Sequence, residues 1–161
     1  MSGIDGTGAV PGDRFDELYE AHAPRARRFA YLVCGDRELA DDAVQEAFVR
    51  LLGRFADRRP PDAFAAYLHK TVLNVLRTWG RSATRERARM ERAARTTAQL
   101  DDDPLWMSLQ SLPDRQRQAV VCRFWLDLSE RDTARVLGCR PGTVKSLISR
   151  ALTALRELRD D

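Results

Sequence analysis

Apolar residues recur at every third or fourth position along most of this 161-residue chain, and nowhere do they alternate convincingly as in a half-buried strand. One such series covers residues 15–32, a second about residues 38–55, and a third residues 64–79. Pro60 and Pro61 separate the second series from the third, because proline disrupts a helix interior. Three amphipathic helices can bury one common core, so the sequence predicts an all-α fold.

A change in composition divides the chain in two. Apolar positions thin out over residues 82–104, where the stretch TTAQLDDDP is rich in residues that compete with helical hydrogen bonds. A second apolar pattern begins at Leu105. We therefore expect two small helical domains, residues 14–81 and 105–161, with a flexible linker between them and a disordered tail over residues 1–13.

The composition argues against several classes of protein. No apolar run approaches membrane-spanning length, and the first dozen residues lack the basic start and apolar core of an export signal, so we expect a cytoplasmic protein without membrane insertion. Cys34, Cys122 and Cys139 are widely spaced and form no CxxC pair, which argues against a disulfide framework or a metal site. We expect them to be small buried hydrophobes.

The sequence also offers no catalytic constellation. Its two histidines, His22 and His69, do not lie near a nucleophile and base arrangement. No glycine-rich nucleotide loop is present. We therefore predict that the protein is not an enzyme and uses no cofactor, metal or small-molecule substrate.

The charges are distributed unevenly although the formal net charge is only +3. Residues 38–46, ELADDAVQE, carry four carboxylates and no base, whereas residues 81–95 carry six arginines against two glutamates. An acidic helix face and a basic segment in one protein indicate more than one kind of partner. Composition alone favours the simpler interpretation, in which both segments are ordinary solvated faces.

Near the C-terminus, a helix stop is followed at once by a helix start. In LGCRPGTVKSLISRAL, residues 137–152, Gly138 ends a brief helix that Ser129 can cap. Pro141 suits the first position of the next helix, because its φ is fixed and it has no N–H to leave unpaired. A short helix, a tight glycine turn and a second helix have the spacing of a helix-turn-helix.

The second helix of this pair separates apolar from polar side chains. Its inward stripe comprises Val144, Ile148, Ala151, Leu155 and Leu158. Its outward set comprises Thr143, Lys145, Ser146, Ser149 and Arg150. Short hydroxyl side chains let a helix approach a DNA groove, and the cations can reach phosphates or guanine edges. Gly142 removes a side chain where the helix N-terminus would meet a phosphate. Helical bundles also pack such pairs, so periodicity alone leaves both interpretations open.

Two motifs together resemble one known family. Residues 111–158 resemble region four of bacterial sigma factors, the module that reads the minus-thirty-five promoter element. ELADDAVQEAFVRLLGRF, residues 38–55, resembles region two, whose pattern is an acidic pair followed by Gln-Glu and an aromatic residue. With regions two and four alone, the chain resembles an extracytoplasmic-function (ECF) sigma factor of the sigma-70 family. The resemblance spans residues 15–158 and rests on two motifs in the right order.

The resemblance implies a transcription factor that binds core RNA polymerase at its clamp and flap regions, recognises promoter DNA and directs transcription initiation. The implied polymerase-binding residues are Asp41, Asp42, Gln45 and Glu46. The implied minus-ten residues are Arg58, Arg59, Lys70, Asn74, Arg77 and Arg81. The implied minus-thirty-five residues are Arg140, Gly142, Thr143, Lys145, Ser146, Ser149 and Arg150. An anti-sigma factor that covers these faces is a further implied partner.

Several positions depart from the family pattern. They are Tyr67 in place of a common tryptophan, Leu73 and Leu147 in place of arginines, Thr78 in place of an aspartate, and Arg140 in place of a serine cap. The promoter sequence, the regulon and the inducing signal therefore stay open. For Trp79, which could stack on a base, we expect a core role because it lies on the apolar stripe.

Two other functions compete with this interpretation. A stand-alone helix-turn-helix regulator would bind DNA tightly without polymerase and would not need the Asp41 to Glu46 cluster. A purely protein-binding helical module would tolerate replacement of Lys145 and Arg150.

Overall fold

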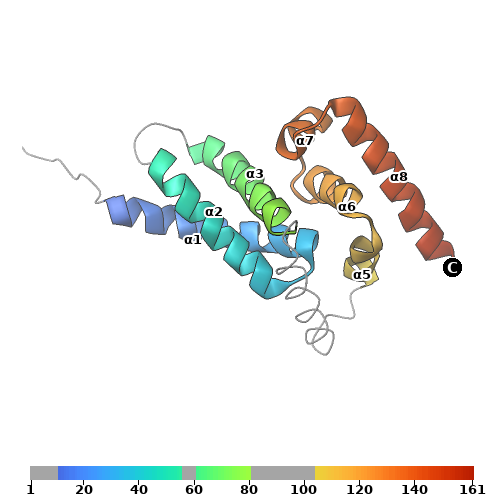
Figure 1. Cartoon of the computed structure of the whole chain (residues 1–161), viewed down its shortest axis with the longest axis horizontal. Coiled ribbons are helices and arrows are strands. Elements are labelled where there is room, and N and C mark those ends of the chain that lie inside the picture. Colours follow the sequence, from blue (N-terminus) through green and yellow to red (C-terminus); the bar gives the residue numbers. More distant parts are fainter. Residues whose placement is uncertain (1–10, 56–60, 81–103) are drawn as a thin grey trace, which may run out of the picture.

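The computed structural model describes residues 11–55, 61–80 and 104–161, and every regular element in those ranges is helical (Figure 1). The first group of helices is α1 (Pro11–Cys34), α2 (Arg37–Phe55) and α3 (Pro61–Gly80). The second group is α5 (Pro104–Ser111), α6 (Asp114–Val120), the π-helical turn η1 (Val121–Trp125), α7 (Glu130–Leu137) and α8 (Pro141–Asp160). The predicted all-α fold is confirmed. Residues 82–103 of the expected linker lie outside the described residues.

Helices α1, α2 and α3 pack against one another around shared apolar side chains. We call these three helices the first module. Phe29, Phe48 and Leu68, one from each helix, are almost completely buried. Phe48 also lies edge-on to Phe15 with ring centroids 5.9 Å apart. Burying side chains of this size contributes roughly 1.5–3 kcal/mol each, so the shared core holds the three helices together.

Gly35 and Asp36 follow the apolar series of residues 15–32 and predict the end of that helix, and the corner between α1 and α2 confirms this stop. Gly35 has a left-handed φ of 73°, and its N–H donates to the Tyr31 carbonyl at 2.8 Å. Asp36 follows, and its side chain accepts the Leu39 N–H at 3.1 Å, which caps the start of α2. The chain therefore reverses direction within two residues.

The second module comprises α5 to α8, and its helix ends are set by short-range contacts. The Ser129 hydroxyl accepts the Asp132 N–H at 3.0 Å at the start of α7. Gly138, with a left-handed φ of 66°, ends α7, and Pro141 occupies the first turn of α8. These observations confirm the predicted stop and start.

The predicted inward stripe of α8 is correct at its centre and wrong at its end. Val144 and Ala151 are completely buried, and Ile148 and Leu155 are half-buried. Leu158 is instead 48% exposed, because the final turns of this 20-residue helix lie beyond the core that covers its beginning. Figure 1 shows this end of α8 projecting from the second module.

His69 connects the stability of the first module to pH. It lies on α3, and its ring meets Phe29 of α1 edge-on at 5.2 Å. Burial, followed by the positive charge of Arg25, lowers the pKa of His69 from 6.5 to about 4. The folded module therefore holds this imidazole in its neutral form at neutral pH.

We predict that acidification weakens the first module through His69. Between pH 6.5 and pH 4 the unfolded chain binds a proton at His69 that the folded chain does not, so stability falls as the pH is lowered. From pH 7 to pH 5 this group alone is expected to remove about 2 kcal/mol. Urea denaturation of the wild type and of His69→Gln at both pH values measures the difference. An equal loss in both proteins would contradict the prediction.

Candidate functional site

The exposed face of α8 is the first candidate surface. All five residues of the predicted outward set are exposed, and Arg140 is exposed beside them. A Cβ added to Gly142 would meet nothing within 4 Å, so the start of this helix is open on that side. No side chain of the described residues caps this helix start, where the Arg140 carbonyl accepts the Thr143 and Val144 N–H groups. An open, uncapped helix N-terminus beside cations can receive a phosphate.

Two details refine this surface. The Ser146 hydroxyl donates to the Gly142 carbonyl of its own helix at 3.1 Å, so its oxygen lone pairs remain for an incoming donor. Leu147, which stands where the family has an arginine, is half-buried and packs against the core of the second module. Leu147 therefore adds no charge to this face, and Lys145 and Arg150 supply the cations of the helix.

A continuous exposed stripe on α2 is the second candidate surface. Asp41, Asp42 and Gln45 are exposed, and Glu46 is half-buried. Asp41 pairs with Arg27 at 3.5 Å, and Glu46 accepts a hydrogen bond from Arg50 at 2.9 Å. Exposed pairs of this kind contribute at most about 1 kcal/mol, so an arriving basic partner can replace them.

The α2 stripe continues into apolar side chains that the sequence analysis did not identify as a surface. Val49 is 64% exposed and Leu52 is 42% exposed. The helical spacing of residues 38–55 predicts a buried stripe made of Val44, Ala47, Phe48, Leu51, Leu52 and Phe55. This prediction is wrong for Leu52, because its neighbour Leu51 fills the core instead. Val49 lies outside that stripe, which was the signal in the sequence that its side chain is exposed. Acidic and apolar side chains together suit a partner that is both basic and apolar.

Helix α3 carries the third candidate surface. Lys70 and Asn74 are exposed one turn apart, and Tyr67 on the preceding turn is 41% exposed. Thr78 donates to the Asn74 carbonyl at 2.9 Å, so its hydroxyl is engaged along its own helix. Leu73, where the family often has an arginine, is completely buried. The exposed face of α3 therefore carries the polar side chains of Tyr67, Lys70 and Asn74.

The other residues that the family resemblance implies for the minus-ten element divide into two groups. Arg58, Arg59 and Arg81 lie outside the described residues. Arg77 is half-buried and turns to the second module, where it donates to the Leu137 carbonyl at 2.9 Å and to Gln118 at 3.4 Å. The structure thus places Arg77 in a contact between modules, apart from the open surface at Lys70.

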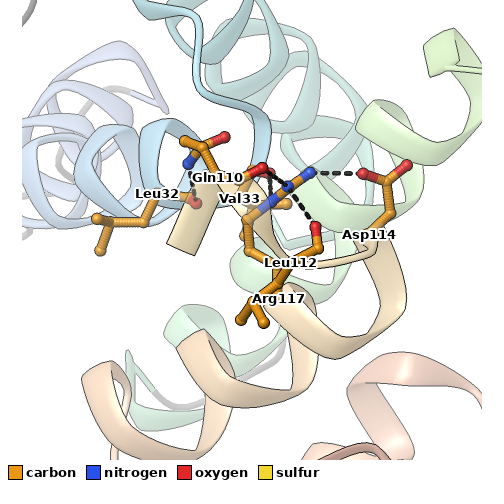
Figure 2. A network of polar contacts seen from close by, with 6 residues as sticks. All are labelled: Leu32, Val33, Gln110, Leu112, Asp114 and Arg117. Atoms are coloured by element: carbon orange, nitrogen blue, oxygen red, sulfur yellow. Dashed lines mark hydrogen bonds and ion pairs between the residues drawn. The ribbon is translucent and has the colours of Figure 1, made fainter. Parts of the chain in front are cut away.

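Arg117 is a buried charged residue that the sequence analysis missed. Figure 2 shows its guanidinium at the centre of a polar network. Its Nε donates to the Val33 carbonyl of α1 at 2.6 Å, and Nη1 donates to the carbonyls of Gln110 and Leu112 at 3.3 and 3.0 Å. Asp114 completes the network with an ion pair. The residue is 5% exposed, and nothing in the sequence distinguishes it from the other arginines.

The cysteines behave as apolar core residues. Cys34 and Cys122 are buried, Cys139 is half-buried, and none of the three forms a disulfide among the described residues. Burial raises the pKa of the Cys122 thiol to about 12, so it stays protonated and unreactive at neutral pH.

Trp79 is partly buried against the core, in agreement with the role expected for it. Among the residues that the structure describes, no helix has the length and apolar character needed to cross a bilayer.

Family models and known proteins match both halves of the chain. The model for sigma-70 region 2 matches residues 18–86, and the model for sigma-70, region 4 matches residues 102–155. The RNA polymerase sigma-E factor of Streptomyces avermitilis is 36% identical over 152 residues, 89% of this chain and 83% of that protein. The ECF RNA polymerase sigma factor SigM of Mycobacterium tuberculosis is 36% identical over 92% of this chain and 80% of that protein.

Solved structures match the fold along almost the whole chain. CnrH, in complex with the cytosolic domain of CnrY, is 26% identical with a TM-score of 0.62, and the match covers 91% of this chain and 87% of that one. The sigma factor RpoE, in complex with the anti-sigma factor NepR from Bartonella quintana, has a TM-score of 0.69 at 23% identity, over 91% of this chain and 97% of that one.

Proposed function

Because the chain belongs to the ECF RNA polymerase sigma factors of the sigma-70 family, we propose that its three exposed helix faces divide the work of transcription initiation. The face of α2 binds core RNA polymerase, the face of α3 holds the minus-ten element, and the face of α8 reads the minus-thirty-five element. Residues 14–81 and 105–161 act as the two modules. The protein works by delivering polymerase to a promoter in the cytoplasm and by stabilising open DNA.

One observation carries the proposal: two exposed faces of opposite character lie on different modules. The α2 face is acidic and partly apolar, whereas the α8 face is cationic and rich in hydroxyl groups. The first repels DNA phosphates and suits a basic protein surface, whereas the second suits DNA. A single chain with both can connect a protein to DNA.

At the polymerase, the Asp41, Asp42, Gln45 and Glu46 set binds the clamp. Carboxylates form charge-assisted hydrogen bonds with arginine or lysine, and the Gln45 amide can both donate and accept. Val49 and Leu52 extend this contact, because burying their exposed apolar surface adds affinity that salt does not screen. The flap region contacts the second module.

At the promoter, α8 enters the major groove with Thr143, Ser146 and Ser149 close to the base edges. Lys145, Arg150 and Arg140 bind phosphates or guanine, and the open helix start at Gly142 receives a phosphate. On the first module, Asn74 addresses a base edge of the minus-ten strand while Lys70, Arg77 and the arginines at positions 58, 59 and 81 bind its backbone.

A protein inhibitor is the further partner that we propose. In their solved structures CnrH is bound to the cytosolic domain of CnrY, and RpoE is bound to the anti-sigma factor NepR. An anti-sigma factor of this chain would cover the α2 face or the groove beside α5. Phe124 and Leu105 make that groove apolar, with exposures of 59% and 64%.

Transcription in vitro tests the proposal. Core RNA polymerase with the wild-type protein is expected to start transcripts at defined sites in a pool of promoters. Lys145→Ala is expected to lower initiation about 10-fold, because one base or phosphate contact contributes about 1–3 kcal/mol. Arg159→Ala removes an exposed cation from the far end of the same helix and serves as the control.

The same experiment separates the competing functions. A protein that shifts DNA while polymerase gains nothing would replace the proposal with a stand-alone regulator. Full initiation by Lys145→Ala would show that α8 does not read the promoter through this residue.

A further inference from the structure

A chain of contacts reaches from the aromatic core of the first module to the acidic face of α2. Tyr19 of α1 packs against the buried Phe48 ring with ring centroids 4.9 Å apart. Its hydroxyl accepts a hydrogen bond from Arg27 Nη2, and the Arg27 guanidinium lies over the Tyr19 ring at 5.5 Å. Arg27 Nε lies 3.5 Å from Asp41 Oδ1 of α2. The core thereby holds a cation beside a carboxylate of the α2 face.

The position of Arg27 is more restricted than that of an ordinary surface arginine. A hydrogen bond and a cation–π contact hold its guanidinium on Tyr19, and the core holds Tyr19. Its Nε is shielded from solvent and has no hydrogen-bond partner among the described residues, so the nearby Asp41 carboxylate is the charge that balances it. Because the side chain is already ordered, pairing costs little conformational entropy. We therefore place this pair at the upper end of the range for exposed ion pairs.

The second paired carboxylate of the α2 face has a less restrained partner. Arg50 lies one turn further along the same helix, and its Nε is 2.9 Å from Glu46 Oε1. The Arg50 side chain is 45% exposed, and it makes no second polar contact among the residues that the structure describes. It can therefore turn into solvent when a partner arrives. Pairs four residues apart on a helix also contribute less than well-held pairs.

A partner cation that approaches Asp41 meets Arg27 beside it. The function proposed above places a basic polymerase surface against α2, so a lysine or arginine of that surface must displace Arg27 or share the carboxylate with it. Tyr19 keeps Arg27 in place, and sharing then brings two like charges together, which weakens the contact. Asp42 forms no ion pair among the described residues and carries no such cost.

The opposite effect, in which Arg27 helps binding by ordering Asp41, is smaller. An aspartate has two side-chain torsions, so fixing one rotamer in advance saves little entropy when the partner binds. Repulsion acts between full charges, and it grows as the interface excludes water. The net result is that Arg27 weakens the contact made by Asp41.

We propose that Arg27 sets the affinity of the α2 face for polymerase: it withholds Asp41 and keeps core binding weaker than the acidic stripe alone would make it. The inference rests on the function proposed above. Tyr19 is the positioning residue, because it holds Arg27 beside Asp41. A weaker contact at equilibrium appears mainly as faster release, so the pair shortens the time that the protein stays on polymerase.

Equilibrium binding of the full chain to core RNA polymerase tests the inference. Arg27→Gln removes the charge, and we expect its affinity to rise about 5-fold, which corresponds to about 1 kcal/mol at 25 °C. Tyr19→Phe keeps the ring against Phe48 but removes the hydroxyl that holds Arg27, and we expect a rise of about 3-fold. Damage to the fold would lower the affinity, so it cannot explain a rise, and circular dichroism melts check each variant.

Three variants serve as controls. Arg28→Gln makes the same charge change at the next position of α1, where the side chain lines the groove beside α5, and its affinity should not change. Arg50→Gln removes the less restrained partner, and its affinity should rise by at most about 2-fold. Arg27→Lys keeps a cation beside Asp41, so it should bind like the wild type.

Asp41→Asn shows whether the effect passes through the carboxylate. In that background Arg27→Gln should raise the affinity by less than about 2-fold, because no carboxylate remains to be released. Three results would overturn the inference. They are an unchanged affinity of Arg27→Gln, an equal rise in Arg28→Gln, and a gain of undiminished size in the Asp41→Asn background.

The Asp42→Arg variant separates this inference from the proposed function. If Asp42→Arg loses core binding and Arg27→Gln gains none, the α2 face binds polymerase and only the inference fails. If Asp42→Arg binds core polymerase like the wild type, α2 is not the polymerase contact. The proposed function then fails at this face, together with the inference that rests on it.

Discussion

Replacing Arg117 by alanine is expected to lower the free energy of unfolding by about 3–5 kcal/mol, because each hydrogen bond from a charged donor contributes roughly 1.5–3 kcal/mol. The guanidinium donates to three carbonyls, those of Val33, Gln110 and Leu112, and pairs with Asp114. Alanine would leave these acceptors without their donor in a site that is 5% exposed. Urea denaturation followed by circular dichroism measures the loss.

Two further variants test whether the loss of stability comes from the guanidinium of Arg117 itself. Arg117→Lys keeps the charge, but a single ammonium cannot reproduce a planar fork that donates in several directions, so we expect it to recover less than half of the loss. Arg115→Ala removes a neighbouring exposed arginine that donates to the Leu137 carbonyl, and it is expected to cost about 1 kcal/mol. A loss below about 1 kcal/mol for Arg117→Ala would mean that the network does not hold the modules.

Reversing the charge of Asp42 is expected to produce the largest functional loss. Asp42 lies exposed within the acidic stripe of α2. In Asp42→Arg, a cation would face the basic surface that we propose on the polymerase, and such like-charge contacts cost several kcal/mol. We expect transcription initiation with core polymerase to fall about 100-fold, and Asp42→Asn, which only removes the charge, to fall about 10-fold.

The control for this experiment is Asp16→Arg, which makes the same charge change at an exposed position of α1. It should initiate transcription like the wild type. Both proteins should bind isolated minus-thirty-five DNA equally, because α8 is unchanged. If Asp42→Arg initiated normally, the α2 stripe would not be the polymerase contact.

At two positions the structure departs from what the local sequence predicts, because tertiary packing outweighs the local preference. Pro24 lies inside α1, although proline removes a helical hydrogen bond. The helix continues through it because Ala23 and Ala26 on either side are buried against the core. Leu52 has the apolar character of a core residue, yet α2 exposes it because the core at that level is already filled.

The sequence could predict those parts of the candidate site that lie on one face of a single helix. The outward set of α8 follows from a period of 3.6 residues once the helix is recognised, and the structure exposes all of it. The same rule could not assign Arg77, because a helix face may meet solvent, DNA or another module. Its two partners in the described structure, Gln118 and Leu137, lie 41 and 60 residues further along the chain.

The sequence by itself determined where the helices of the second module begin and end. Ser129, Gly138 and Pro141 act on atoms a few residues away, so their effect is local and readable. The tertiary structure alone decided which arginine is buried between the modules. Arg117 donates to a carbonyl 84 residues earlier, and the two groups meet only when the helices of both parts of the chain pack together. A buried guanidinium requires several acceptors at fixed positions, and only the assembled fold provides them.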